Sequence, residues 1–226
     1  MDVKNFFDSF KDFFWDIIGY LLPGLYLLFL LSVCIVPERY YTSEIIKSQP
    51  ELSIFALIVL SYILGYLIYG VGVIKDKRLG KFSSTKKIEE KTRDKAEFKL
   101  SKEIVRKYIT ANNLSTVVPD DIKTRDLRNI VMPFVSEVDN KTYTFMFRSD
   151  LCKHIGNTSL IVGVLGLINN LIEWKWTHIS LFKTGFDYII LYSILIVSYF
   201  FFRATRNYFY SIAIKIPFSA YITKAK

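Results

Sequence analysis

Residues 17–36 read IIGYLLPGLYLLFLLSVCIV and residues 52–74 read LSIFALIVLSYILGYLIYGVGVI, and neither run contains an Asp, Glu, Lys or Arg. A bilayer core of about 30 Å is crossed by about 20 helical residues, so each run is long enough to span a membrane. Residues 156–172 and 188–202 form two further apolar runs of nearly that length. The chain of 226 residues is therefore predicted to be an all-α integral membrane protein with four spans.

A basic segment, residues 75–155, separates the second span from the third and is too polar for a bilayer, so a cytosolic helical insert is predicted. Apolar residues recur at helical spacing over residues 85–110, which indicates one amphipathic helix. Pro119–Asp121 is typical of a helix start, and Pro133 is expected to stop or bend the helix that follows. A last helix beginning near Ser136 meets no Gly or Pro before the third span, so it is expected to continue into that span.

Residues 203–226 follow the fourth span and are predicted to be a cytosolic tail. The fourth helix is expected to extend past the bilayer as far as Lys215. Pro217 is expected to end it, because proline lacks a backbone N–H and clashes with the preceding turn. The rest of the tail has too few apolar residues to fold alone, so it either docks on the insert or frays.

The basic residues outside the spans are unevenly distributed: 19 lie between the second and third spans, 5 follow the fourth, and each other segment has 2. Cytoplasmic loops collect Lys and Arg near span ends. Both termini, the insert and the tail are therefore expected in the cytoplasm, and residues 37–51 and 173–183 on the other side. Cys34 and Cys152 then lie on opposite sides of the membrane, so no disulfide is expected between them.

Five phenylalanines before the first span recur at the spacing of one helix face: Phe6, Phe7, Phe10, Phe13 and Phe14. Residues 1–16 are therefore predicted to form an interfacial amphipathic helix whose phenylalanines rest in the headgroup region. A partner-binding face is the alternative. Within the first span, Pro23 removes a backbone donor and is expected to kink the helix.

Small residues at helical spacing mark two of the spans as packing helices: Ser61 and Gly65 in the second, and Ser159, Gly163 and Gly166 in the third. Such residues let two helix backbones approach closely. They predict that the second and third spans either pack on each other or form an oligomer contact. Asn169 and Asn170, near the outer end of the third span, are expected to bond a neighbouring helix, with a pore-lining role as the alternative.

The sequence favours a non-enzymatic protein. A tetrahedral zinc site needs three or four converging side chains, and the two histidines, His154 and His178, are expected on opposite sides of the membrane. No glycine-rich loop precedes a lysine, and no acid lies within the spans. No catalytic residue, metal ligand or cofactor site is therefore predicted.

Basic residues supply the only site-like feature. One group near the span ends is expected to meet the anionic lipids of the inner leaflet: Lys75, Lys77, Arg78, Lys81, Lys86, Lys87, Arg203 and Arg206. A second group is a candidate pocket for an anion or an acidic partner: Arg106, Lys107, Lys123, Arg125, Arg128 and Arg148. Aromatic side chains for base stacking are sparse among them, which argues against binding of single-stranded nucleic acid.

The whole chain, with its four spans, the Pro23–Gly24 pair, the basic insert and the helical tail, resembles the small membrane subunits of bacterial anti-phage defence systems such as Kiwa. The resemblance is one of architecture. It implies a homo-oligomer in the bacterial inner membrane that senses a membrane disturbance or a cytosolic ligand. It also implies a response, either permeabilisation of the membrane or a signal to a soluble partner.

The leading hypothesis is a sensor or effector whose insert couples a ligand or a partner to the spans. A small channel or transporter component is the first alternative, although the spans contain few polar residues. A membrane scaffold that holds a soluble enzyme is the second. These hypotheses differ in whether ions flow through the isolated protein and whether a soluble protein accompanies it.

Overall fold

The computed structural model describes residues 3–35, 50–78, 84–112, 118–175 and 181–225. It is all-helical, with 91% helix and no strand in these ranges. The helices are α1 (Val3–Cys34), α4 (Pro50–Arg78), α5 (Ser84–Arg93), α6 (Ala96–Ala111), α7 (Thr124–Val131), the 3₁₀ helix η2 (Met132–Val138), α8 (Asp139–Lys175) and α9 (Phe186–Lys224). Stretches within α1, α4, α8 and α9 are long and apolar enough to cross a membrane, which is consistent with a multi-pass membrane protein.

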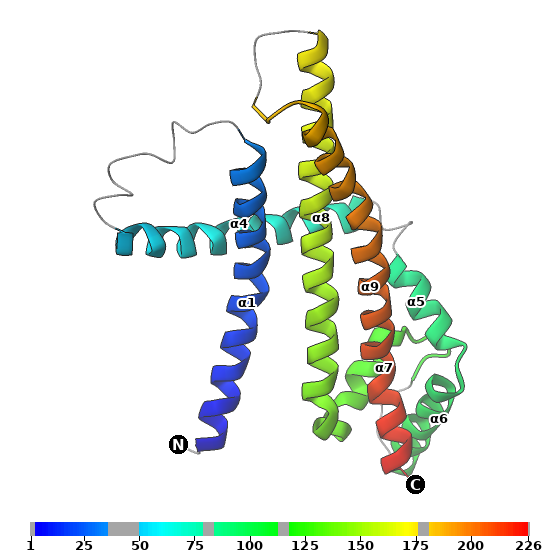
Figure 1. The fold of residues 1–226 in the computed structure, drawn as a ribbon. Coiled ribbons are helices and arrows are strands. Elements are labelled where there is room, and N and C mark those ends of the chain that lie inside the picture. The colour runs from blue at the N-terminus through cyan, green and yellow to red at the C-terminus, as the bar shows by residue number, and fades with distance from the viewer. Residues whose placement is uncertain (1–2, 36–49, 79–83, 113–117, 176–180, 226) are drawn as a thin grey trace. The chain divides into compact units, whose positions relative to one another are not determined.

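The chain divides into two compact units, each built from two separate segments. Unit 1 contains Met1–Arg78 and Asp150–Ala204, and unit 2 contains Leu79–Ser149 and Thr205–Lys226. Helices α8 and α9 each contribute residues to both units (Figure 1). Because α8 runs unbroken from Asp139 to Lys175, the predicted continuity between the helix expected near Ser136 and the third apolar run is confirmed. The helix begins three residues after Ser136, since η2 precedes it.

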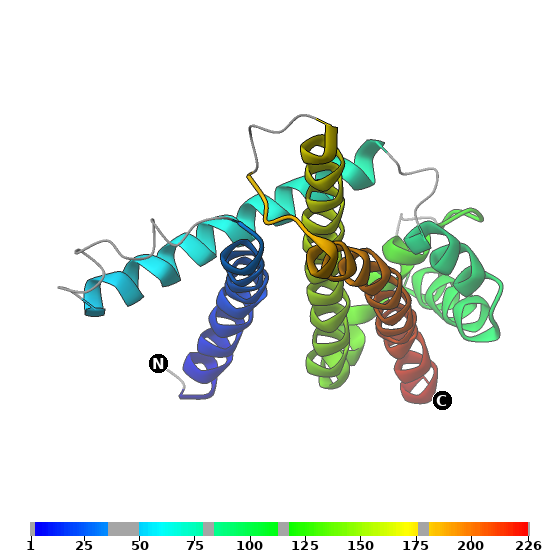
Figure 2. The same cartoon turned by 45° about the horizontal axis from the view of Figure 1, so that its top comes forward.

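In unit 1, α4 crosses α1 at a contact between glycines (Figures 1 and 2). A Cβ atom built on Gly65 would lie 1.9 Å from the carbonyl oxygen of Tyr20, and one on Gly24 would lie 1.7 Å from that of Ser61. Both glycines are therefore required for the two backbones to approach this closely. The ring of Tyr20 also stacks on Tyr66, with 3.9 Å between ring centroids.

The glycines of the third span pack on α9. A Cβ atom on Gly163 would lie 2.8 Å from the carbonyl oxygen of Tyr192, and one on Gly166 would lie 2.4 Å from the ring of that tyrosine. Small residues thus mark real packing surfaces, but Gly65 pairs with α1 and these two pair with α9. Helices α4 and α8, which contain the second and third spans, also contact each other: Lys153 donates to Asp76 (2.7 Å), and the rings of Tyr69 and His154 lie 5.4 Å apart. Spacing along one helix therefore indicates a packing surface but does not identify the partner of each small residue.

Asn169 and Asn170 of α8 bond backbone groups of residues 181–185, which directly precede α9. Asn169 donates a hydrogen bond to the carbonyl of Phe182 (3.1 Å) and accepts one from the backbone N–H of Leu181 (3.3 Å). Asn170 accepts from the N–H of Gly185, which has a φ of +123°. Both amides therefore satisfy backbone groups of the connection, whereas the sequence predicted bonds to a neighbouring helix.

Unit 2 has a small apolar core supplied by α6, α7, η2 and the C-terminal part of α9. Its buried members are Phe98, Val105, Val118, Ile122, Leu127, Val131, Val135, Phe218 and Tyr221. The single helix predicted over residues 85–110 is wrong, because the chain is extended at Lys95 (φ −76°, ψ 150°) and divides into α5 and α6. The break lets α6 bury Phe98, Ser101 and Val105, while Leu100 and Tyr108 of the predicted apolar stripe stay exposed.

The helices that follow α6 agree better with the predictions from the sequence. The helix predicted after Pro119–Asp121 is α7, which begins at Thr124. At Met132 it changes to the 3₁₀ geometry of η2, with Pro133 in the first turn, and the backbone leaves helical geometry at Val135 (φ −131°, ψ 42°). The predicted bend is therefore present, two residues after Pro133.

The prediction that Pro217 ends the last helix is wrong, since α9 continues to Lys224. Proline in a helix interior loses one backbone hydrogen bond and costs about 3 kcal/mol. Burial offsets this cost here: Pro217 is fully buried, Phe218 is 0% exposed, and Ser101 donates a hydrogen bond to the carbonyl of Phe218. The tail therefore docks on the insert, the first of the two outcomes that the sequence left open.

Some predictions fall partly outside the described residues. Helix α1 begins at Val3, so the N-terminal helix and the first span form one helix, but the phenylalanine face of residues 1–16 lies outside the described side chains. Pro23 is fully buried inside α1, and the predicted kink stays a prediction. Lys81, His178 and most of residues 37–51 also lie outside the described part.

Candidate functional site

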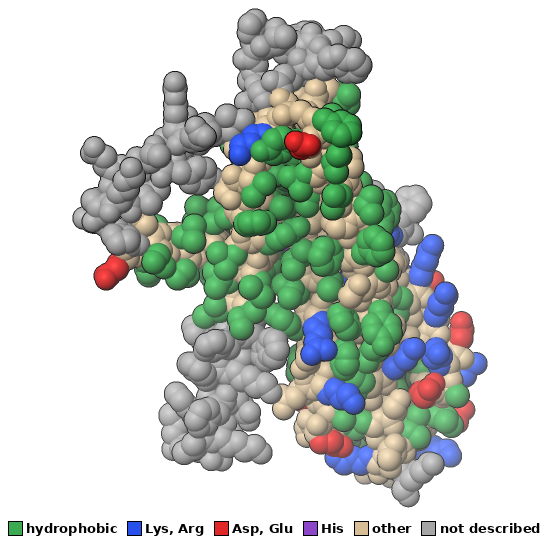
Figure 3. All heavy atoms as spheres, viewed as in Figure 1, with side chains coloured by type: hydrophobic (Ala, Val, Ile, Leu, Met, Phe, Trp, Pro, Cys, Tyr) green, Lys and Arg blue, Asp and Glu red, His purple; other side chains and the backbone are tan. Residues whose placement is uncertain are grey.

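All of the net charge of the chain resides in unit 2. This unit has 19 Lys and Arg against 10 Asp and Glu, whereas unit 1 has 11 of each, so the formal charge of +9 belongs to unit 2. Figure 3 shows charged side chains over its helices and apolar side chains over those of unit 1. A surface of one sign attracts anionic ligands and acidic partners.

Two of the predicted pocket residues are engaged inside unit 2. Arg125 donates from Nε to the Oε1 of Glu89 (2.8 Å), and the hydroxyl of Tyr210 donates to the same oxygen (2.6 Å). Arg106 donates to the Oδ1 of Asp120 (2.6 Å), which also pairs with Lys102. These arginines fasten α7 to α5 and the Asp120 loop to α6, so their first role is structural.

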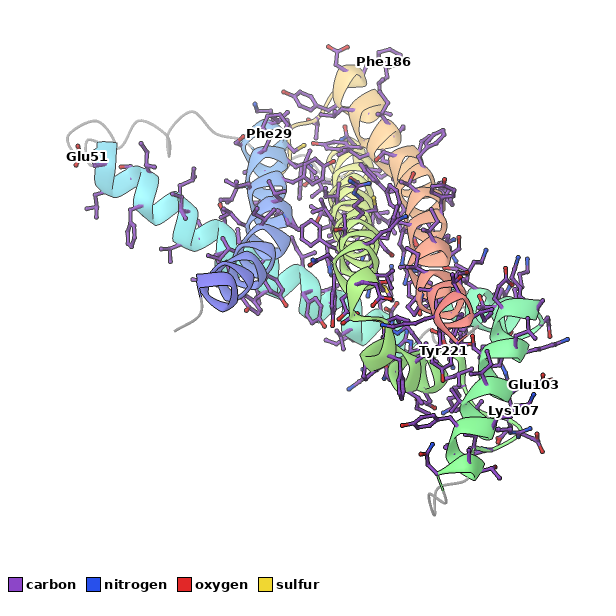
Figure 4. All side chains as sticks on the ribbon, turned by 90° about the horizontal axis from the view of Figure 1, so that it is seen from below. Phe29, Glu51, Glu103, Lys107, Phe186 and Tyr221 are labelled. Carbon is purple, nitrogen blue, oxygen red and sulfur yellow. The ribbon has the colours of Figure 1, made fainter. Side chains whose placement is uncertain are left out.

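The other four predicted residues are placed apart from these pairs. Arg128 donates to the side-chain oxygen of Asn129, and Arg148 lies over the rings of Phe145 and Phe209. Lys107 and Lys123 are exposed, and Figure 4 shows Lys107 projecting from α6 beside Glu103. The four arginines thus have different partners, and a common pocket for all six residues stays a prediction.

A groove of about 350 Å³ lies on unit 2 beside the predicted residues. It is lined by Glu90, Arg93, Asp94, Phe98, Lys99, Lys102 and Asp120. Three acids and three bases balance one another in this lining, so the groove has no preference for an anion. The exposed lysines, Lys107 and Lys123, are therefore better candidates for anion binding than the groove.

The predicted lipid-facing residues also differ in their surroundings. Lys77, Arg78, Lys86, Lys87 and Arg203 are exposed and available to anionic headgroups. Arg206 instead donates hydrogen bonds to the hydroxyls of Thr85 (2.7 Å) and Ser84 (3.3 Å) at the start of α5. Lys75 donates to the side-chain oxygen of Asn157, a contact within unit 1.

Two polar pairs were missed by the sequence reasoning: Tyr210 with Glu89, and Lys153 with Asp76 at 2.7 Å. Both join residues more than 70 positions apart, so no local spacing reveals them. The second has a recognisable signal, because Asp76 is one acid among the basic residues that end α4. Among the described residues, no group of three His, Cys, Asp or Glu side chains is placed to hold a metal ion.

Comparisons with protein-family models, with curated proteins and with solved structures find no match. The assignment of a function therefore depends on the residues and contacts described above.

We expect Asp120→Asn to lower the melting temperature slightly at neutral pH. The Arg106 guanidinium, and next the Lys102 ammonium, hold the pKa of Asp120 below its ordinary value of 3.8. A carboxylate with a lowered folded pKa contributes stability above its unfolded pKa and loses it as the pH falls through the folded pKa. The effect is small because Asp120 is exposed.

Thermal unfolding of the wild-type and D120N proteins between pH 7 and about pH 2 measures this difference, which should shrink toward zero at the acid end. Asp121→Asn, at the exposed neighbouring position, is the control and should leave the melting temperature unchanged. A difference that persists undiminished at the acid end would show that the Asp120 contacts do not depend on its charge.

Proposed function

We propose that the chain is a non-enzymatic, oligomeric inner-membrane sensor or effector in which unit 2 receives an anionic ligand or an acidic partner. The observation that carries this proposal is the concentration of the whole net charge of +9 in unit 2. A largely apolar unit with no net charge, joined to a strongly basic unit, fits a membrane anchor joined to a unit that binds an anionic ligand or an acidic partner.

The continuity of α8 supports the coupling part of the proposal. Residues 139–149 of this helix belong to unit 2 and residues 150–175 to unit 1, without a Pro or a non-helical residue between them. An unbroken helix transmits a shift or a rotation along its axis. We therefore propose that ligand binding to unit 2 is passed to the spans through α8.

The biological setting proposed for this activity is bacterial anti-phage defence, on the architectural resemblance alone. A response by membrane permeabilisation would need several copies of the chain. Asn169 and Asn170 bond backbone groups of the connection between α8 and α9. This use of the two amides disfavours the alternative of a selective channel within one chain.

Charge reversal at the two exposed lysines, Lys107 and Lys123, tests whether unit 2 binds an anionic ligand or an acidic partner there. Lys107→Glu with Lys123→Glu should weaken binding of an acidic partner or anionic vesicles at least tenfold, because each replacement exchanges attraction for repulsion. Both side chains are exposed, so the fold should be unaffected. Arg106 and Arg125 are unsuitable for this test because they hold Asp120 and Glu89.

The measurement is co-sedimentation of the full-length protein with vesicles of anionic and of zwitterionic lipids, and recovery of a soluble companion after mild-detergent purification. Lys141→Glu, an exposed reversal elsewhere in unit 2, is the matched control. Equal binding by the double variant and the wild type would contradict a binding site at Lys107 and Lys123. A stoichiometric soluble enzyme recovered with every variant would favour the scaffold alternative.

A further inference from the structure

The C-terminal end of α4, which we call its inner end, is held on α8 by polar contacts within unit 1. Lys153 donates to the carboxylate of Asp76 at 2.7 Å, and the two side chains are 13% and 40% exposed. One residue earlier on α4, Lys75 donates to the side-chain oxygen of Asn157, which is 4% exposed. We call these four residues the α4–α8 latch.

Close packing surrounds the latch. A Cβ atom on Gly72 would lie 3.4–3.7 Å from atoms of Lys153, Asn157 and His154, which is ordinary van der Waals contact, so α4 packs on α8 at this position. The Tyr69 and His154 rings lie 5.4 Å apart between centroids. The ammonium group of Lys75 also lies 5.4 Å from the ring centre of Tyr199 on α9.

The two ends of α4 differ in how they are held. Between Leu52 and Leu60 the large apolar side chains are all exposed, and the middle is fixed on α1 by Gly65 and Ser61. The C-terminal end of α4, in contrast, is held by the charged side chains of Lys75 and Asp76. A partly buried ion pair costs desolvation that nearly cancels its attraction, so such a pair opens with a small change in free energy. Among the described residues, the packed contact of α4 with α1 at Gly65 contains no ion pair that could open in this way.

The latch also lies beside the places where the chain passes from one unit to the other. Asp76 is two residues before the end of the first segment of unit 1, and Lys153 is three residues after the start of its second segment. A displacement of α8 at its entry into unit 1 therefore reaches Lys153 within one helical turn.

We propose that the α4–α8 latch is a conformational switch: it holds the inner end of α4 on α8 at rest and opens when unit 2 binds its ligand. This proposal rests on the proposed sensor function and identifies the contact through which the signal reaches α4. Opening breaks the Asp76–Lys153 and Lys75–Asn157 contacts and leaves the α1–α4 contact closed.

Charge exchange across the latch tests the contact itself. In the full-length protein, Asp76→Lys and Lys153→Asp should each lower the melting temperature by about 5 °C or more, because each leaves two like charges facing one another. The double variant D76K/K153D restores opposite charges and should recover at least half of the loss. Lys141→Asp, at an exposed position on the same helix α8, is the matched control and should have no effect.

Hydrogen–deuterium exchange in lipid nanodiscs then reports opening. Residues 66–78 should exchange faster in each single variant than in the wild type, and the double variant should return to the wild-type rate. Residues 57–65, which include the α1 contact, should be unchanged. Unaltered exchange of residues 66–78 in folded, membrane-inserted single variants would overturn the latch, as would failure of the double variant to recover stability.

Growth of bacterial cells that express each variant separates the latch from the sensor function. An open latch should arrest growth without a stimulus, whereas D76K/K153D and K141D should grow like the wild type. Faster exchange with no growth arrest in any variant would contradict the sensor function and, with it, the regulatory role of the latch. Unaltered exchange would contradict the latch alone.

Discussion

Gly65→Ala should separate α1 from α4 and lower the free energy of unfolding by about 3 kcal/mol, the upper end of the range for overpacking. The added methyl group would lie 1.9 Å from the carbonyl oxygen of Tyr20. A side chain in that position could rotate away, but a backbone carbonyl is fixed by its helix. The two helices must therefore move apart along their whole contact, including the stacked rings of Tyr20 and Tyr66.

Gly70→Ala is the matched control for this change, because a Cβ atom at Gly70 has no neighbour within 4 Å. It should be neutral or stabilising by up to about 1 kcal/mol, since alanine favours helix more than glycine. Thermal unfolding in one detergent compares the two variants directly. Equal melting temperatures for G65A and G70A would contradict the close crossing of α1 and α4.

Phe218→Ala should lower the free energy of unfolding of unit 2 by about 3–5 kcal/mol, as expected when a buried phenylalanine is truncated in a core. Phe218 is 0% exposed and packs edge-to-face on Phe98, with 5.5 Å between ring centroids. Its loss leaves a cavity and removes the packing that keeps α9 helical beyond Pro217.

Limited proteolysis of the full-length protein in detergent measures this effect, with cleavage expected first in the residues after Pro217. Ser219→Ala, at the exposed neighbouring position, should leave the protease resistance unchanged. An F218A protein as resistant as S219A would show that the tail is not part of the core of unit 2.

The spans were predictable because a bilayer imposes a length and excludes charge over that length. The continuity of α8 was also predictable, because neither a Pro nor a Gly interrupts the sequence from Ser136 to the third span. The partner of each small residue was not predictable, although α4 and α8 do contact each other at Asp76 and Lys153. Gly65 and Gly163 each indicate that some helix approaches closely, but a glycine does not specify which helix.

The helix boundaries in unit 2 depended on tertiary packing. The break at Lys95 is not marked by a Gly or a Pro. It exists because Phe98 and Val105 enter the core, on a helix face different from that of the exposed Leu100 and Tyr108. Pro217 gave the opposite error, since a strong local signal was overridden by burial of the residues around it. Local helix propensity predicts helix boundaries poorly where burial in a hydrophobic core determines them.

The candidate site was predictable as a charge pattern but not as a set of contacts. Counting Lys and Arg locates the basic unit, yet it does not separate Arg125, which binds Glu89, from Lys123, which is exposed. That difference arises from pairings between distant segments. The Asp76–Lys153 pair has the same origin, although a single acid within a basic helix end draws attention to it.

The division of unit 2 into two distant segments has a consequence during synthesis of the protein. The core around Leu127 and Val131 is completed by Phe218 and Tyr221, which a ribosome adds about 90 residues later. At about 5–20 residues per second, the insert waits for several seconds while α8 and the first part of α9 are made. Its apolar side chains lack their final cover for that interval, so nascent chains of this protein should depend on chaperones more than finished ones do.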